Sequence, residues 1–505
     1  MKWFATYYVT TNCLVMLLLI IACKGPLKDN KSPSDENLAA RKTQAKTLDG
    51  QYIFWQEHII DDRQIGGVEI SGSDGLVTGD LDQDGYLDIV SVHESDTVSD
   101  GVPRGHIRIA FGSSSPNHWE LLTLAEGQEA AAAEDVAIDD INGDGYLDIV
   151  AACELAHLIY FENPVKDIRT SRWNRIIPKV TRDRGSFIRV FTADLDQDGQ
   201  AEIIAANKGD QLGYGTRDSD ITDLKPISYF EIAGDPLDDD SWIEHELVSV
   251  RIPINSQPID MDGDGDLDVI AGSRGEGQII LLENISQNNI EFLMHPVDVL
   301  AEDLSQKDRP ASGNKNPWIT GFNMDFVDFS GDQKLDIILT ESSNNLVWLE
   351  QPSSWSEKWK LHPIGSFGPD YLVGLKAADI NDDGQIDRMT GGYSQGPRST
   401  DGKVTVDDAL GRLAWFEHPG DLSKSWIRHD ISRRKRGMFD KFIAQDMDGD
   451  GDMDFISTRG NSYPFDGVFW MEQRRSDNPQ ASFFKARPLD SEEMPLPKIP
   501  SDRQL

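Results

Sequence analysis

Seven copies of one acidic nonapeptide recur along the chain, and they constrain the fold more than any other feature. Successive copies start 60, 54, 66, 68, 51 and 67 residues apart, and each contains or precedes a short apolar run such as LDIVSV or LDVIAG. A recurring unit of this length indicates a repeat architecture, in which one supersecondary unit is stacked against its neighbours. The copies start at Asp80, Asp140, Asp194, Asp260, Asp328, Asp379 and Asp446.

The residue types in the nonapeptide favour a hard cation. Oxygen-bearing side chains occupy positions 1, 3, 5 and 9, and glycine occupies position 6 in every copy except the fifth. Calcium prefers several carboxylate and carbonyl oxygens around a sharp turn. An EF-hand would add a glutamate at position 12, which no copy has, so these loops are not EF-hands.

We therefore predict up to seven structural calcium ions, one in each loop. The fifth loop should bind most weakly, because Ser330 replaces an aspartate and Gln333 replaces the glycine. The predicted ligands are Asp80, Asp82, Asp84, Asp88, Asp140, Asn142, Asp144, Asp148, Asp194, Asp196, Asp198, Glu202, Asp260, Asp262, Asp264, Asp268, Asp328, Ser330, Asp332, Asp336, Asp379, Asn381, Asp383, Asp387, Asp446, Asp448, Asp450 and Asp454.

The segments between the loops predict four short strands in each repeat. An apolar run precedes each loop and another follows it. A third run has an aromatic-acidic signature, as in LIYFENP and RLAWFEHP, and a fourth reads WKLHPI or WIRHDI. Four strands per unit, repeated around an axis, are typical of propeller blades. We predict an all-β, seven-bladed β-propeller over residues 51–490, in which residues 52–60 complete blade seven. Residues 482–489 compete for that place.

The loops and the aromatic-acidic strands resemble FG-GAP/VCBS-type repeats, which are related to the propeller of integrin alpha chains. The resemblance covers about residues 51–490, although the literal FG and GAP tripeptides are missing. It implies calcium in the loop that joins strands one and two of each blade. It does not fix a function, because this fold carries many.

The N-terminal residues predict an exported lipoprotein. A lysine precedes a short apolar stretch, and Ile20-Ile21-Ala22-Cys23 resembles a bacterial lipobox. We expect a signal peptide over residues 1–23, lipidation of Cys23, a flexible tether over 24–50 and a C-terminal tail over 491–505. An ordinary secretory signal is the alternative. The lysine after Cys23 resembles lipoprotein signals for the outer membrane, so we expect an outer-membrane or cell-surface location.

The formal charge of −39 is concentrated in the predicted metal loops. Seven calcium ions would reduce it to about −25. So acidic a chain is a poor partner for nucleic acid, which binds proteins through lysine and arginine contacts to its phosphates. We expect a monomer whose partners are the membrane, through the lipid, and a glycan or protein ligand.

The predicted ligand face is the one opposite the calcium loops. Lys208, Arg274 and Arg459 occupy equivalent strand ends, and Arg184 and Arg434 lie in loops between blades. These five cations predict an anionic ligand. Ordinary loop variability is the competing interpretation.

An enzyme is the second hypothesis for the function. A polysaccharide lyase acting on an acidic glycan would use His93 and Tyr393 as weak catalytic candidates. No nucleophile elbow, zinc motif, P-loop or dinucleotide fingerprint is present, which favours a binding protein.

Overall fold

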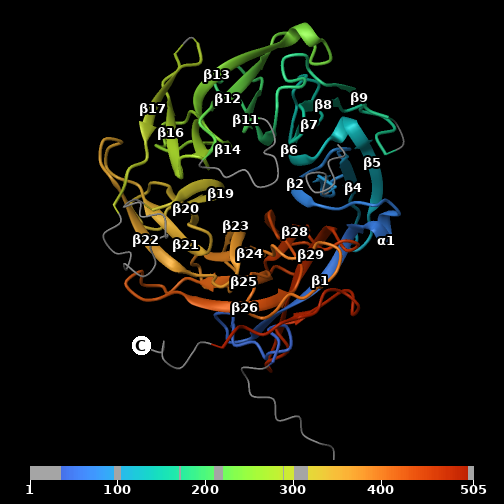
Figure 1. The fold of residues 1–505 in the computed structure, drawn as a ribbon, viewed down its shortest axis with the longest axis vertical. Coiled ribbons are helices and arrows are strands. Elements are labelled where there is room, and N and C mark those ends of the chain that lie inside the picture. Colours follow the sequence, from blue (N-terminus) through green and yellow to red (C-terminus); the bar gives the residue numbers. More distant parts are fainter. Residues whose placement is uncertain are drawn as a thin grey trace, which may run out of the picture.

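The computed structural model describes residues 36–95, 104–169, 172–209, 220–287, 289–300 and 317–498. Seven β-sheets surround a central axis and form a ring, as Figure 1 shows. The predicted seven-bladed β-propeller is confirmed. The described residues contain one short α-helix, α1 (Arg63–Gly66).

Each of blades one to six consists of four consecutive antiparallel strands, counted from the axis outwards. Blade one contains β2 (Ser73–Gly79), β3 (Asp88–His93), β4 (His106–Phe111) and β5 (Glu120–Glu126). Blade two contains β6 (Ala133–Asp139), β7 (Asp148–Cys153), β8 (Leu158–Glu162) and β9 (Asn174–Ile176). Blade three contains β10 (Phe187–Ala193), β11 (Glu202–Asn207), β12 (Leu224–Ile232) and β13 (Trp242–Arg251).

The next three blades repeat this order. Blade four contains β14 (Pro253–Ile259), β15 (Asp268–Ser273), β16 (Gln278–Asn284) and β17 (Phe292–Pro296). Blade five contains β19 (Ile319–Val327), β20 (Asp336–Glu341), β21 (Asn345–Glu350) and β22 (Trp359–Ser366), with β18 (Val299–Leu300) added outside. Blade six contains β23 (Tyr371–Ala378), β24 (Asp387–Tyr393), β25 (Gly411–Glu417) and β26 (Ile427–Arg434).

Blade seven is assembled from both ends of the chain. Its inner strands are β27 (Phe442–Gln445), β28 (Asp454–Arg459) and β29 (Gly467–Ser476), and its fourth is β1 (Tyr52–Asp62). β1 runs antiparallel to β29 from Tyr52 opposite Ser476 to Asp62 opposite Gly467. β30 (Phe483–Phe484) pairs outside β1. The preference for residues 52–60 as the closing strand is confirmed, and the competing segment adds a fifth strand.

Two predicted boundaries need correction. Residues 36–50, predicted as part of a flexible tether, pack against the C-terminal part of the chain. Leu38 is fully buried, and its N–H donates to the carbonyl of Met494 at 3.2 Å. Residues 491–498, predicted as tail, pair with blade six, where the N–H of Met494 donates to the carbonyl of Arg433 at 2.7 Å. Buried apolar and ionic contacts hold both segments, and they lie side by side outside blade seven in Figure 1. Residues 1–35, including Cys23, lie outside the described residues.

The hydrophobic core is divided among the junctions between blades. Seven clusters of buried apolar side chains occur, and each joins two neighbouring blades; Leu76 and Trp470, for example, link blades one and seven. Each blade is therefore stabilised mainly by the apolar surface that it buries against the two neighbouring blades. β1 contributes to the last junction through the buried side chain of Ile60.

The antiparallel topology gives the ring two distinct faces. The loop face carries the seven nonapeptides, each between strands one and two of its blade. The mouth face carries the loops between strands two and three and the links between blades. In blades one to six the pairing of strands one and two is interrupted by a bulge or irregularity at its mouth-face end.

Removal of residues 51–60 is expected to open the ring. The variant would leave the whole of β29 as an unpaired edge and remove the buried side chains of Ile53 and Trp55. Exposed strand edges promote association between chains. Size-exclusion chromatography should show aggregates and heating should show a lower melting temperature. A monomeric variant with the parent's melting temperature would contradict the role assigned to β1.

Candidate functional site

The nonapeptide loops share one hydrogen-bonded framework. In the first loop the carboxylate of Asp80 accepts hydrogen bonds from the N–H groups of Asp84 at 3.0 Å and Gly85 at 2.9 Å. Gly85 has a φ of 87°, a conformation that favours glycine. The fifth loop keeps the turn with Gln333, whose φ is 71° and whose N–H donates to Asp328 at 2.8 Å. Its backbone is therefore formed at the cost of strain.

The carboxylate at position 9 joins each loop to the sheet. Asp88 is buried and accepts hydrogen bonds from Leu81 N–H at 2.8 Å and Gly112 N–H at 2.9 Å. Burial raises the pKa of Asp88 to about 6, and that of the equivalent Asp387 to about 8, with further increases from neighbouring loop carboxylates. A nearby cation would favour the charged form of these groups.

The loop carboxylates converge in four blades. One oxygen from each of three side chains lies within 4.8 Å of the others. These sets are Asp80, Asp82 and Asp88; Asp194, Asp196 and Glu202; Asp260, Asp262 and Asp264; and Asp446, Asp448 and Asp454. Convergent oxygen ligands on a tight turn fit calcium, so the donor set is compatible with the predicted ion.

In blade one an arginine partly neutralises the loop. Nε of Arg169 lies 2.7 Å from Asp82, and Nη2 lies 2.7 Å from Asp84. These are two of the four predicted ligands of that loop. A cation entering there shares the carboxylates with this guanidinium.

Sequence reasoning missed a set of amide side chains that connect neighbouring loops. Asn163 Nδ2 donates to Leu81 O in blade one and to Leu147 O in its own blade, both at 3.0 Å. Gln473 Nε2 similarly links Ile380 O at 2.9 Å to Met453 O at 3.2 Å. Asn284 and Gln351 make equivalent bonds to the preceding blade. The signal was present in the sequence, because a glutamate of each of these third strands is directly followed by an Asn or Gln.

The predicted ligand residues Arg434 and Arg459 require correction. Arg434 is fully buried and contacts Glu57 at 2.8 Å, Asp490 at 3.0 Å and Glu493 at 3.2 Å. Arg459 is 2% exposed and forms a two-pronged ion pair with Asp490. Both guanidinium groups are used inside the protein and do not face solvent.

The other three predicted cations have mixed surroundings. The N–H groups of Lys208 and Arg274 donate to equivalent carbonyls, those of Ser186 and Ile252, so the predicted equivalence of these strand ends is confirmed. Lys208 forms an ion pair with Glu154. Arg184, which is partly exposed, pairs with Glu244.

The two catalytic candidates occupy unfavourable positions. His93 is fully buried, and its ring nitrogens contact the hydroxyls of Ser73 at 2.7 Å and Ser91 at 3.1 Å. Burial, followed by the charges of Glu94 and Asp74, raises the pKa of Tyr393, which makes its phenolate harder to form. These surroundings do not favour a catalytic role for His93 or Tyr393.

A buried arginine crosses the centre of the ring. Arg189, from the inner strand of blade three, is 2% exposed and lies 3.4 Å from Asp440 before blade seven and 3.4 Å from Asn323 of blade five. Asn323 Nδ2 also donates to Asp440 at 2.8 Å. These contacts tie three blades together across the axis.

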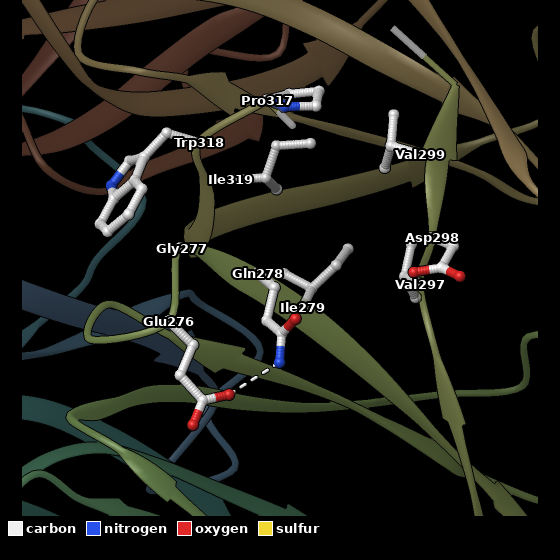
Figure 2. A pocket seen from close by; sticks show the side chains of 10 residues that line it. All are labelled: Glu276, Gly277, Gln278, Ile279, Val297, Asp298, Val299, Pro317, Trp318 and Ile319. Atoms are coloured by element: carbon white, nitrogen blue, oxygen red, sulfur yellow. Dashed lines mark hydrogen bonds between the residues drawn. The ribbon is translucent and has the colours of Figure 1, made fainter. Parts of the chain in front are cut away.

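A cavity of about 240 Å³ opens on the mouth face between blades four and five. Figure 2 shows Glu276 and Gln278 on one side, joined by a 2.7 Å hydrogen bond, with Asp298 and Val299 opposite and Trp318 above. Trp318 is half-buried and packs closely over Gly277, where a Cβ would lie 2.4 Å from its ring. Gly277 has a φ of 62°, so glycine is required both by its backbone and by the ring above it.

Comparison with known proteins agrees with this fold. The family model described as FG-GAP-like repeat matches residues 140–205, which span the second nonapeptide loop to the strand after the third. The chain is thus a seven-bladed β-propeller with an FG-GAP-like repeat, as the sequence resemblance implied. No curated protein matches the sequence.

Two solved structures are similar to most of the chain. One is a lectin of Agrocybe aegerita that recognises non-reducing terminal N-acetylglucosamine, with 12% identity over 73% of this chain and 82% of that one, and a TM-score of 0.42. Another is BBS1N in complex with ARL6DN, with 8% identity over 83% of this chain and 97% of that one, and a TM-score of 0.43. Within the described residues, no helix has the length and apolar character needed to cross a membrane.

Proposed function

We propose that the protein is a calcium-stabilised propeller, anchored to an outer membrane or cell surface by lipid, that binds a glycan through its mouth face. The cavity beside Trp318 carries this proposal. It combines an aromatic ring with the acidic and amide side chains of Glu276, Asp298 and Gln278. Small-molecule sites commonly combine a concave, partly apolar wall with a few polar groups that set orientation.

The chemistry of the cavity suits hydroxyl-rich sugars. The ring of Trp318 offers an apolar surface for the C–H face of a sugar, and the carboxylates accept hydrogen bonds from hydroxyl groups. Among the residues that the structure describes, two acidic side chains line the cavity and no basic side chain does. The side chains of Lys208, Arg184, Arg434 and Arg459 are held in ion pairs within the protein. We therefore propose that the ligand is held by packing on the tryptophan ring and by hydrogen bonds rather than by charge attraction. If the protein binds no glycan on the array described below, a protein ligand is the alternative.

A glycan array with matched tryptophan variants tests the proposal. Trp318→Ala should abolish binding to the glycans that the parent recognises, and Gly277→Ala should weaken it by displacing the ring. Trp355→Ala is the control, because Trp355 is also half-buried but lies at a loop-face pocket with Asp262 and Lys334. Loss of binding only in Trp355→Ala would move the ligand to the loop face. Unchanged binding in Trp318→Ala would contradict the proposal.

Membrane anchoring has its own test. Cys23→Ser should abolish labelling with radioactive palmitate and release the protein from membranes, because the lipid supplies the hydrophobic attachment. The melting temperature of the released protein should equal that of the parent, because the substitution lies outside the propeller. A variant that stays in the membrane fraction without label would indicate an uncleaved signal segment.

A further inference from the structure

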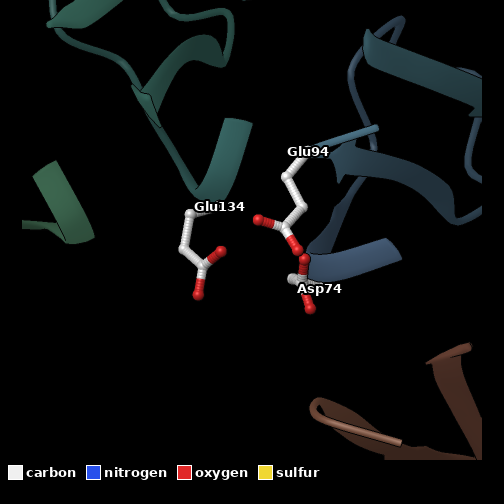
Figure 3. A group of neighbouring side chains, drawn as sticks. All are labelled: Asp74, Glu94 and Glu134. Atoms are coloured by element: carbon white, nitrogen blue, oxygen red, sulfur yellow. The ribbon is translucent and has the colours of Figure 1, made fainter. Parts of the chain in front are cut away.

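Three carboxylates from two blades meet at the mouth face, away from the nonapeptide loops. Asp74 belongs to β2, Glu94 follows β3, and Glu134 belongs to β6. One oxygen from each lies within 4.8 Å of the other two, and Figure 3 shows the three side chains pointing toward one another. All three are buried, with exposed fractions of 2%, 8% and 8%.

Irregularities in the inner strands explain why these side chains meet. Asp74 lies where the pairing of β2 with β3 shifts register between Ser73 and Leu76. Glu134 lies at the equivalent shift in β6, between Ala133 and Asp135. A bulge turns a side chain out of the regular alternation of a strand. The equivalent strand irregularity in blades one and two therefore directs the side chains of Asp74 and Glu134 toward each other.

One atom of the cluster has no hydrogen-bond partner. Oδ2 of Asp74 is buried without a donor within reach. A buried, unpaired carboxylate oxygen costs free energy, because its hydration is lost and nothing replaces it. The carboxylate that carries this oxygen belongs to the group formed with Glu94 and Glu134, so a cation bound there would contact Asp74 as well.

Carboxylates outnumber cationic side chains around the cluster. Its electrostatic neighbours include Asp440, Arg189, Arg398 and Lys208. Arg398 lies 3.6 Å from Glu94, and Lys208 also pairs with Glu154. In this set five carboxyl groups face three cationic side chains.

We propose that Asp74, Glu94 and Glu134 bind one divalent cation at the mouth face, in addition to the ions of the nonapeptide loops. The all-oxygen donor set favours calcium over softer metals. The ion would supply a partner for the Asp74 carboxylate and add positive charge among these carboxyl groups. It would also tie blade one to blade two on the face opposite the loops.

The experiment counts bound calcium per chain by equilibrium dialysis of the folded protein with ⁴⁵Ca. Glu134→Gln and Asp74→Asn should each bind one calcium fewer than the parent, because both substitutions keep shape and remove one charged ligand. Glu341→Gln is the control: Glu341 is a fully buried carboxylate at a strand end of the same face, and its partners are Ser342 and Asn345. The control should bind as many ions as the parent.

A second measurement separates metal binding from a structural role. In EDTA, both variants should melt at or above the temperature of the parent, since repulsion among carboxylates is relieved. A calcium count equal to the parent's in both variants would overturn the proposal. So would the loss of one ion in Glu341→Gln, because the count would then follow general damage to the mouth face.

Discussion

Addition of EDTA to the calcium-loaded protein is expected to lower its melting temperature by about 10 °C or more. A ligand present at 100 times its Kd adds about 2.7 kcal/mol of stability per site, and several sites act together here. At an unfolding entropy of about 2.1 cal/mol/K per residue, about 1 kcal/mol corresponds to roughly 1 °C in a domain of about 440 residues, so four filled sites would add about 11 °C. The physical reason is the crowding of carboxylates around Asp80, Asp82 and Asp88 and their counterparts, which repel one another without a cation. Differential scanning calorimetry with and without calcium measures the effect.

Two matched substitutions at position 1 refine this expectation. Asp260→Ala should cost more stability than Asp328→Ala, because the fifth loop has Ser330 in place of an aspartate and strained Gln333 in place of glycine. The difference should disappear when both variants are measured in EDTA. Melting temperatures that do not respond to EDTA would contradict structural calcium altogether.

Substitution of Asp490 by alanine is expected to destabilise the protein by about 3–5 kcal/mol, the usual cost of removing one partner from a buried ion pair. Asp490 is the charged partner of Arg459 and one of three partners of Arg434. Without it, the guanidinium of Arg459 keeps its hydrogen bond to the hydroxyl of Ser462 at 3.0 Å but has lost its buried ion pair. Urea denaturation of parent and variant measures the difference.

The control and the pH dependence make this prediction specific. Asp421→Ala removes an exposed pair with Lys424 and should cost far less stability than Asp490→Ala, because solvent screens exposed ion pairs. Burial alone would raise the pKa of Asp490, but Arg459 and Arg434 hold this pKa well below its usual range. Its contribution is therefore complete above the unfolded pKa of about 4 and is lost as the pH falls below that value. The difference between parent and Asp490→Ala should shrink in acid, and a constant difference would contradict the ionic explanation.

The repeated parts of the fold were predictable because their signals recur. Seven loops of one pattern, followed by strands of one pattern, determine the number of blades and the face on which each loop lies. Residues 52–60 were identified as the closing strand because they match a fourth strand without preceding partners. Repeated packing contacts follow the same pattern: His362 and His429 of the fourth strands stack on Trp348 and Trp415 of the neighbouring third strands.

The contacts that occur once were not predictable. Arg434 and Arg459 were predicted to be exposed cations of a ligand face. Their partners Glu57 and Asp490 lie outside the repeated sequence pattern, so the pattern does not predict these ion pairs. The packing of residues 36–50 depends on contacts across more than 400 residues of sequence, such as Leu38 with Met494, and residues 491–498 pair with Arg433, which lies 61 residues before Met494. The acidic cluster depends on register shifts, which move Asp74 and Glu134 toward one point without a change in residue pattern.

The place of β1 in blade seven also sets the order in which the protein can reach its final structure. Asp62 leaves the ribosome about 400 residues before its partner Gly467. At synthesis rates of about 5–20 residues per second, that interval is on the order of 20–80 s. Throughout this time the segment that forms β1 lacks its partner strand β29. Blade one and blade six also lack their contacts with blade seven. The nascent chain therefore spends most of its synthesis with an edge that chaperones or translocation must protect from pairing with other chains.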